Sequence, residues 1–119
     1  MKTFEELEVY QKALDFTIVI FKLTNEKSIN RNIVYQIERA SLSISNNISE
    51  GFELQSNKQF VKFLYIAKAS CGECRNLLAV MHKLEQIETQ TYSDLKTKSL
   101  EVSKQLSNFI KYLKNSEIQ

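Results

Sequence analysis

The residues from Phe60 to Met81 form the most regular pattern in the chain. Apolar side chains recur there in unbroken steps of four and three residues, at Phe60, Leu64, Ala67, Cys71, Cys74, Leu78 and Met81. This spacing places all seven on one face of an α-helix and is typical of the seam of a helical bundle. A helix from Ser56, where Ser56 and Gln59 form a capping box, to about Glu88 would measure roughly 45–50 Å at ~1.5 Å per residue. We expect it to be longer than the other helices.

Turn-forming residues are scarce in the rest of the chain. Its 119 residues include no proline and only two glycines, whereas a sheet protein of this length needs many turn residues. A bundle of long helices needs only three connections, and this length suffices for one ordinary core. We therefore predict an all-α protein, a single up-down-up-down antiparallel four-helix bundle over residues 1–119 with a long third helix.

The first helix is predicted to run from a capping box of Thr3 with Glu6 to about Leu23. Two apolar stripes follow opposite sides of it. One consists of Val9, Ala13, Phe16, Ile20 and Leu23, and the other of Leu7, Tyr10, Leu14, Ile18 and Phe21. A surface helix of a monomer needs only one apolar face. The second stripe therefore indicates contact with another copy of the chain or, alternatively, a helix closely buried within a monomer.

The second helix follows a short polar link, residues 24–28. It is predicted from about Asn30 to Glu50, with Gly51 as a left-handed C-cap. Its core stripe is Ile33, Ile37, Ala40, Ile44 and Ile48. The serine-rich stretch from residue 38 to 52 is therefore helix rather than loop, because its isoleucines stay in phase with those before it.

A polar seam runs beside these isoleucines, flanked on its other side by Tyr35 and Leu42. We expect the seam to be partly buried, where each unpaired group would cost ~1–3 kcal/mol, and we expect Arg39 to pair with a carboxylate of Glu50 or Glu73. A solvated helix edge is the alternative. The predicted seam or interface residues are Arg39, Ser43, Asn47 and Glu50, with Ser70 and Glu73 of the third helix as partners.

The fourth helix is predicted to start between Thr91 and Asp94 and to end near Asn115. Its inward-facing residues are Leu95, Val102, Leu106, Phe109 and Leu113. Residues 58–114 carry 10 basic and 5 acidic side chains, against 6 and 8 in residues 1–57. Candidate nucleic-acid contacts are Lys96, Lys104, Lys111 and Lys114, within about 80° of arc on the fourth helix, and Lys58, Lys62, Lys68 and Arg75 on the third.

This basic surface could follow the phosphates of a nucleic acid, and repetition in an oligomer would strengthen its field. The alternative is a charged surface that only aids solubility. No aromatic platform interleaves clearly with the lysines, so base-specific binding is not expected.

The run RASLSISNNISEG, residues 39–51, resembles the RAAVSIPSNIAEG signature of four-helix-bundle proteins encoded in intervening sequences of bacterial large-subunit (23S) ribosomal RNA genes. The segments VYQKA, residues 9–13, and FVKFLYIAKAS, residues 60–70, are also similar to the family, as are Phe4, Leu7 and Gln36. The chain departs from it at Tyr10, Ser45, Ser49 and Ala69, where the family has tryptophan, proline, alanine and glycine. Without that proline we expect a less kinked second helix.

The resemblance implies a ring-like homopentamer without established enzymatic activity and with a link to RNA. Accessory proteins of diversity-generating retroelements resemble this family in fold, and they are associated with nucleic acid and reverse transcriptase. A ribonucleoprotein or reverse-transcriptase-like partner is therefore a further possibility by analogy of fold.

Catalytic chemistry has little support in the sequence. The Cys71-Gly72-Glu73-Cys74 motif lies in mid-helix on the core stripe, where burial disfavours the thiolate, so buried core cysteines are expected rather than a redox pair. Zinc needs about four ligands, and His82 is the sole histidine. His82 and Glu85 could form an acid/base pair, but a solvated surface is the simpler interpretation. We predict no enzyme, no metal and no cofactor.

The N-terminal segment MKTFEELEVY lacks the cationic and apolar regions of a signal peptide, and no apolar run approaches the ~18 residues of a membrane span. We expect a cytoplasmic protein without a membrane partner. The predicted function is a non-enzymatic oligomeric bundle that binds RNA or a ribonucleoprotein without sequence specificity. The alternative is a structural or adaptor ring that contacts another protein and no nucleic acid.

Overall fold

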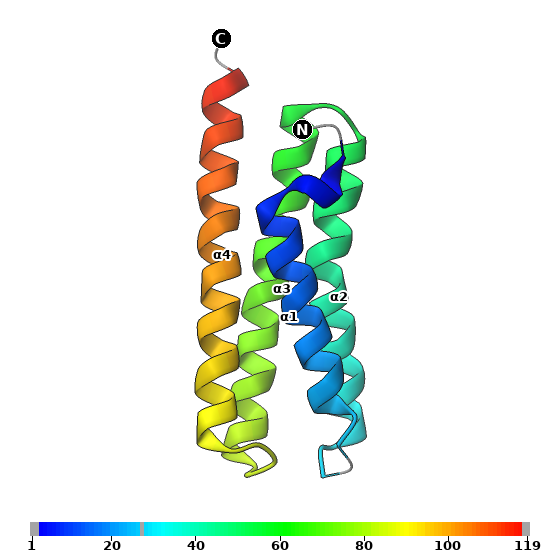
Figure 1. Cartoon of the computed structure of the whole chain (residues 1–119), viewed down its shortest axis with the longest axis vertical. Coiled ribbons are helices and arrows are strands. Elements are labelled where there is room, and N and C mark those ends of the chain that lie inside the picture. The colour runs from blue at the N-terminus through cyan, green and yellow to red at the C-terminus, as the bar shows by residue number, and fades with distance from the viewer. Residues whose placement is uncertain (1–2, 27, 118–119) are drawn as a thin grey trace.

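Four α-helices stand side by side in the computed structural model, which describes residues 3–26 and 28–117 and measures 51 × 20 × 19 Å (Figure 1). Lys27, in the predicted first link, lies outside the described residues. The elements in chain order are η1 (Phe4–Glu6), α1 (Glu8–Thr24), α2 (Arg31–Glu53), α3 (Asn57–Lys83) and α4 (Thr89–Glu117).

The helices pack in the order in which they occur in the chain. Between the described residues, α1 and α3 each pack against α2 and α4, whereas no Cα atoms of the diagonal pairs α1–α3 and α2–α4 approach within 8 Å. Short links reverse the direction of each helix, as Figure 1 shows. The predicted up-down-up-down four-helix bundle is confirmed.

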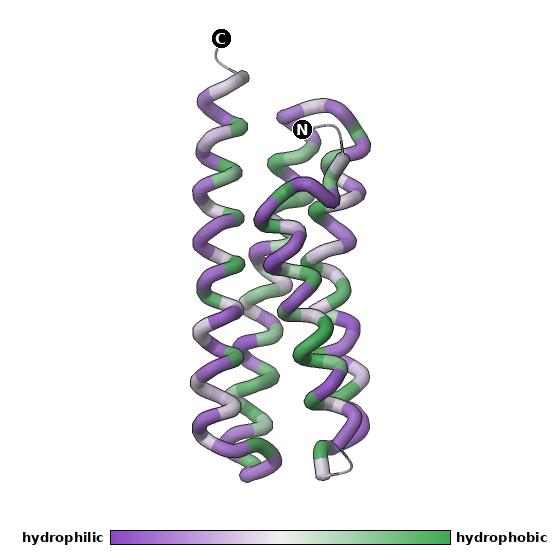
Figure 2. The backbone as a smooth tube through the Cα atoms, in the orientation of Figure 1, coloured by the Kyte–Doolittle hydropathy of each residue, from purple (hydrophilic) through white to green (hydrophobic). Residues whose placement is uncertain are grey.

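The core forms where the apolar periodicity predicted it. All seven residues of the pattern from Phe60 to Met81 are buried, and so are the five residues of the α2 stripe. Figure 2 shows the same division on α4, which is hydrophobic on the side toward the bundle and hydrophilic on the opposite side. On α4, Phe109 is only half-buried while Ile110 is buried. Each fully buried aliphatic side chain contributes about 1.5–3 kcal/mol of transfer free energy.

The start of α1 differs from the prediction. Thr3 precedes the short helix η1 and its hydroxyl makes no capping hydrogen bond, and Leu7 is extended, with ψ 128°, before α1 begins. This break turns the Leu7 side chain into the core, where it is 7% exposed. Leu7 therefore does not belong to the outer apolar stripe.

The prediction that Gly51 ends the second helix is wrong. The helix continues to Glu53, and the left-handed residue is Gln55, with φ 53°. Gly51 lies where α2 meets α3: a Cβ on it would lie 2.7 Å from Cβ of Phe63 and 2.8 Å from Cδ1 of Phe60. Glycine is needed here for close packing rather than for a left-handed backbone.

The relative lengths of α3 and α4 also differ from the prediction. α3 ends at Lys83, because Glu85 adopts φ 59° and the N–H of Gln86 donates to the carbonyl of Met81 over 2.9 Å. At its other end, Ser56 caps α3 as predicted and accepts a hydrogen bond from the N–H of Gln59. α4 has 29 residues against 27 in α3, so α4 is the longer helix. Its C-terminal end extends beyond the rest of the bundle (Figure 1).

Candidate functional site

The polar seam lies between α2 and α3. Asn47 Nδ2 donates to the Ser43 carbonyl over 2.7 Å and to Ser43 Oγ over 3.0 Å, and Ser70 Oγ of α3 donates to Ser43 Oγ over 2.9 Å. Ser43 and Asn47 are half-buried, and Ser70 is buried. The predicted partnership of Ser70 with the seam is therefore confirmed, and this hydrogen bond ties α2 to α3.

The charged members of the seam behave differently. Arg39, Glu50 and Glu73 are exposed, although they line one shallow groove of about 460 Å³ with Gln36, Ala40, Leu42, Ser43, Asn46 and Asn47. Among the described residues, Arg39 makes no hydrogen bond or ion pair. The expected pair of Arg39 with Glu50 or Glu73 is not formed within the chain, because each charged group reaches solvent and needs no partner there. Leu42 and Tyr35, which were expected to help enclose the seam, are exposed as well.

This groove has the chemistry of a binding surface. It offers a guanidinium, amide groups and two carboxylates, which together can donate and accept hydrogen bonds. Its only half-buried hydroxyl, Ser43 Oγ, is bonded to Ser70 and Asn47, and no histidine lines the groove to activate it.

The basic residues predicted on the third and fourth helices meet along the α3–α4 surface. Arg75 Nη1 donates to Ser99 Oγ over 3.2 Å, and Ser99 Oγ donates to the carbonyl of Cys71 over 3.2 Å. Lys114 Nζ donates to the hydroxyl of Tyr65 over 2.9 Å. Lys68 and Arg75 are half-buried, whereas Lys58, Lys62, Lys96, Lys104, Lys111 and Lys114 are exposed.

Charge is distributed unequally between the two halves of the bundle. α3 carries five basic and one acidic side chain and α4 five basic and three acidic, whereas α1 and α2 together carry four basic and five acidic. The positive potential is therefore concentrated on α3 and α4.

The outer side of α1 is apolar. Leu14, Ile18 and Phe21 are between 36% and 47% exposed, while the opposite stripe is buried except for the half-buried Leu23. Thr17 Oγ1 of α1 donates a hydrogen bond to the carbonyl of Ser41 of α2 over 2.9 Å. Ile18 follows Thr17 and Leu42 follows Ser41, so these two apolar residues flank the α1–α2 junction. Close burial of α1 within a monomer, the alternative interpretation of its two stripes, is therefore excluded. We call Leu14, Ile18, Phe21 and Leu42 the α1–α2 apolar patch.

Both cysteines lie in the core, as predicted. Cys71 and Cys74 are free thiols with no exposed surface. Burial raises the pKa of Cys71 to about 11, against a smaller opposing effect of Arg75, and raises that of Cys74 to about 12. A thiol that keeps its proton at neutral pH and is inaccessible has neither property of a reactive cysteine.

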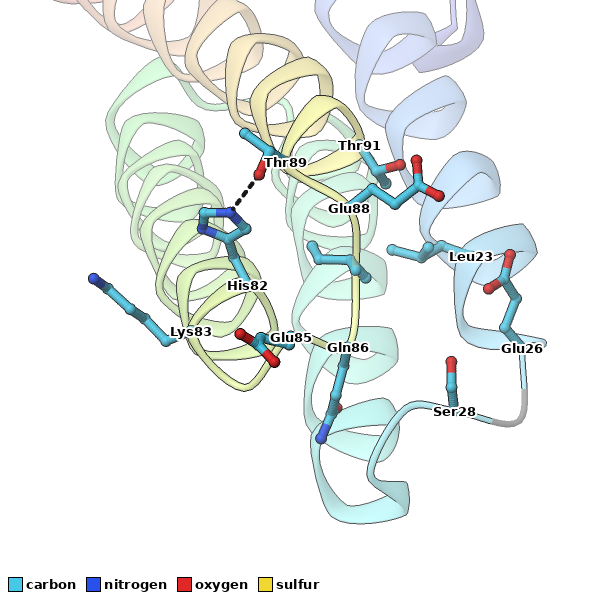
Figure 3. A pocket seen from close by; sticks show the side chains of 11 residues that line it. Leu23, Glu26, Ser28, His82, Lys83, Glu85, Gln86, Glu88, Thr89 and Thr91 are labelled. Carbon is cyan, nitrogen blue, oxygen red and sulfur yellow. Dashed lines mark hydrogen bonds between the residues drawn. The ribbon is translucent and has the colours of Figure 1, made fainter.

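A hollow of about 800 Å³ lies between the α1–α2 link and the α3–α4 link (Figure 3). His82 Nε2 lies 3.0 Å from Thr89 Oγ1, and its ring stacks on Tyr92 with centroids 4.6 Å apart. No hydrogen bond or ion pair joins His82 to Glu85 in the described part of the chain, so the considered acid/base pair is not formed.

Residues 3–26 and 28–117 contain neither a metal-binding cluster nor a helix suited to crossing a membrane. No three His, Cys, Asp or Glu side chains gather there as a metal ion would require. None of the helices in these ranges combines the length and the apolar character needed to span a bilayer.

Comparison with known proteins relates the chain to one family. The model of the 23S rRNA-intervening sequence protein family matches residues 5–108. A crystal structure of a protein of unknown function, from the S23 ribosomal protein family of Bacteroides thetaiotaomicron, superposes with a TM-score of 0.80 and 31% sequence identity. The match covers 87% of this chain and 98% of that chain. No curated protein matches the sequence significantly.

Proposed function

The chain belongs to the 23S rRNA-intervening sequence protein family, and from this premise we propose that it is a non-enzymatic protein that assembles from several copies and binds RNA without sequence specificity. The RNA would lie on the α3–α4 surface. The α1–α2 apolar patch would join the copies, in the homopentamer that the resemblance implies. Buried free cysteines fit a reducing compartment such as the cytoplasm.

One observation supports the RNA surface most directly. Eight predicted basic side chains lie on two neighbouring helices, and contacts such as Arg75 to Ser99 connect these helices at that surface. Phosphate groups bind such surfaces through long-range attraction and through release of counterions. In an assembly, several copies of the surface would act together, so that weak single contacts would give strong binding overall.

Assembly is supported by the exposed apolar side chains of α1 and α2. Leu14, Ile18 and Leu42 are each about 40% exposed or more, with values of 39%, 47% and 42%. An exposed patch of neighbouring apolar side chains is typical of a surface that contacts protein. A second copy covering this patch would remove it from water.

Two measurements on the purified protein test the proposal. Light scattering should give a mass several times that of one 13.9 kDa chain. Titration of a structured RNA at several salt concentrations should give an affinity that falls steeply as salt rises. A stable monomer would refute the assembly. Negligible RNA binding at low salt would refute the RNA function and favour the adaptor alternative, in which the assembly contacts another protein.

A further inference from the structure

An exposed aromatic ring lies within the basic surface. Tyr65 of α3 is 47% exposed, and its hydroxyl accepts a hydrogen bond from Lys114 Nζ of α4 over 2.9 Å, with the Nζ atom 5.1 Å from the ring centroid. Tyr65 lies between Lys62 and Lys68 in the sequence, a position overlooked in the sequence alone, whereas its contact with Lys114 spans 49 positions and is visible only in the structure. The structure corrects the expectation that no aromatic platform interleaves with the lysines.

Three lysines flank this ring on its own helix. Lys62 and Lys68 are each three residues from Tyr65, and Lys58 is seven residues away, so all three share its face of α3. Lys111 lies one turn before Lys114 on α4. The only acidic residue of α3, Glu73, is two turns further along. Lys114 also holds the Tyr65 ring in place through its hydrogen bond.

We propose that Tyr65 is a stacking site for an unpaired RNA base, with the lysines around it following the phosphates on either side. This rests on the proposed RNA function and specifies its substrate as a single strand. The bases of a duplex are stacked on one another and cannot cover a protein ring, whereas a splayed base can. Stacking on an aromatic side chain tolerates any base, because every base has a π-face.

Two tyrosines of α4 differ from Tyr65 in their surroundings. Tyr112 is 65% exposed, but it stacks on Phe109 with ring centroids 6.4 Å apart, and no hydrogen bond to a lysine is formed by its hydroxyl in the described residues. One face of Tyr92 is covered by His82, whose ring lies parallel to it at an angle of 2°. Tyr35 is more exposed than Tyr65, at 64%, but it lies on α2, which carries two basic and three acidic side chains. Tyr35 is therefore a matched control for the loss of an exposed tyrosine.

The test compares two probes and three variants. An RNA oligonucleotide of about 12 nucleotides is titrated as an unstructured strand and as a duplex with its complement, and binding is followed by fluorescence anisotropy at one fixed salt concentration. The variants are Tyr65→Ala, Tyr65→Phe and Tyr35→Ala. Circular dichroism and light scattering establish that each variant keeps its fold and its mass.

The wild-type protein should bind the single strand more tightly than the duplex. Tyr65→Ala should weaken single-strand binding about 5- to 150-fold, the range for loss of one base stack, and should leave duplex binding nearly unchanged. Tyr65→Phe should retain most of the affinity because it keeps the ring, and Tyr35→Ala should bind like the wild type.

Two results would overturn the stacking site while leaving the RNA function intact. One is undiminished single-strand binding by Tyr65→Ala. The other is an equal loss for single strand and duplex, which would assign to Tyr65 only a role in positioning Lys114. Absence of RNA binding by the wild-type protein would instead refute the proposed function, and the stacking site with it.

Discussion

The outer sides of α1 and α4 cover the same core but differ in chemistry. On α1 the outward residues include Leu14, Ile18 and Phe21, and its charges are balanced, with two basic and two acidic residues. On α4 the outward side carries four lysines of the basic surface, and Leu100 is an isolated apolar residue among them. Core packing requires only the inner side of each helix. The contrast between the outer sides is what the proposed function requires, with a surface for protein on α1 and a surface for nucleic acid on α4.

The strongest test of this contrast places the same charge on both sides. Ile18 and Leu100 are equally exposed, at 47%, so Ile18→Lys and Leu100→Lys are matched changes. Ile18→Lys should dissociate the assembly, because a charge buried without a partner costs about 4 kcal/mol, or roughly a thousandfold in the association constant. Sedimentation across a range of protein concentrations measures this. Leu100→Lys should keep the wild-type mass, and an equal effect of the two changes would remove the distinction between the sides.

A smaller effect is expected from charge reversal on α4. Lys104→Glu with Lys111→Glu should lower the slope of log affinity against log salt by at least ~1.4, about 0.7 for each lost phosphate contact with a single strand. The control is Lys12→Glu with Lys22→Glu, which changes the net charge equally on exposed positions of α1. If both double variants lose RNA affinity equally, net charge rather than the α3–α4 surface governs binding.

The shared core can be weakened by alkaline pH, which should affect both surfaces at once. An exposed thiol of the unfolded chain has a pKa near 9.0, whereas the folded-state pKa is about 11 for Cys71 and about 12 for Cys74. Between these values the unfolded state binds fewer protons, so the free energy of unfolding falls as pH rises, by up to about 1.4 kcal/mol per pH unit for each thiol.

Urea unfolding between pH 7 and pH 11 measures this dependence. In the double variant Cys71→Ala with Cys74→Ala, the free energy of unfolding should fall less steeply above pH 9.0, the unperturbed thiol pKa. This variant lacks the two thiols that lose a proton on unfolding. Identical pH dependence in the two proteins would contradict the role assigned to the buried thiols.

The smallest effect is expected at the seam. Arg39→Ala should change the free energy of unfolding by less than about 0.5 kcal/mol, since Arg39 is exposed and has no partner within the described chain. Ser70→Ala, which removes the hydrogen bond to Ser43, should cost about 1 kcal/mol. Urea unfolding distinguishes the two. A loss of mass in Arg39→Ala with unchanged unfolding would add the seam groove to the contacts between copies.

The core of the fold was predictable because the period of burial and the period of the helix coincide. The run from Phe60 to Met81 satisfies both, and every member is buried. The ends of the helices were less predictable, because a glycine after an apolar run has the same appearance whether it caps a helix or permits close packing. The positions of Phe60 and Phe63 on the next helix distinguish these roles for Gly51.

The candidate sites depended on distances between helices, and periodicity does not specify these. It placed Arg39 on the correct edge of α2 but could not tell that its side chain stays in solvent. Periodicity placed Lys114 on the basic side of α4. It does not specify how α4 is positioned along the length of α3, and this position brings Lys114 to Tyr65. Ser70 was correctly expected as a partner of the seam, and the structure identifies Ser43 as the residue to which it bonds.

The contact of Gly51 with Phe60 and Phe63 bears on how relatives of this protein should be compared. A glycine that recurs in a signature is readily taken for part of an active centre, but here steric exclusion is a sufficient reason for it: any larger residue would push α3 away from α2. Its recurrence among homologues would report the spacing of two helices and would say nothing about a reaction. Evidence for a shared activity must therefore come from the solvent-facing positions of the signature, beginning with the guanidinium of Arg39.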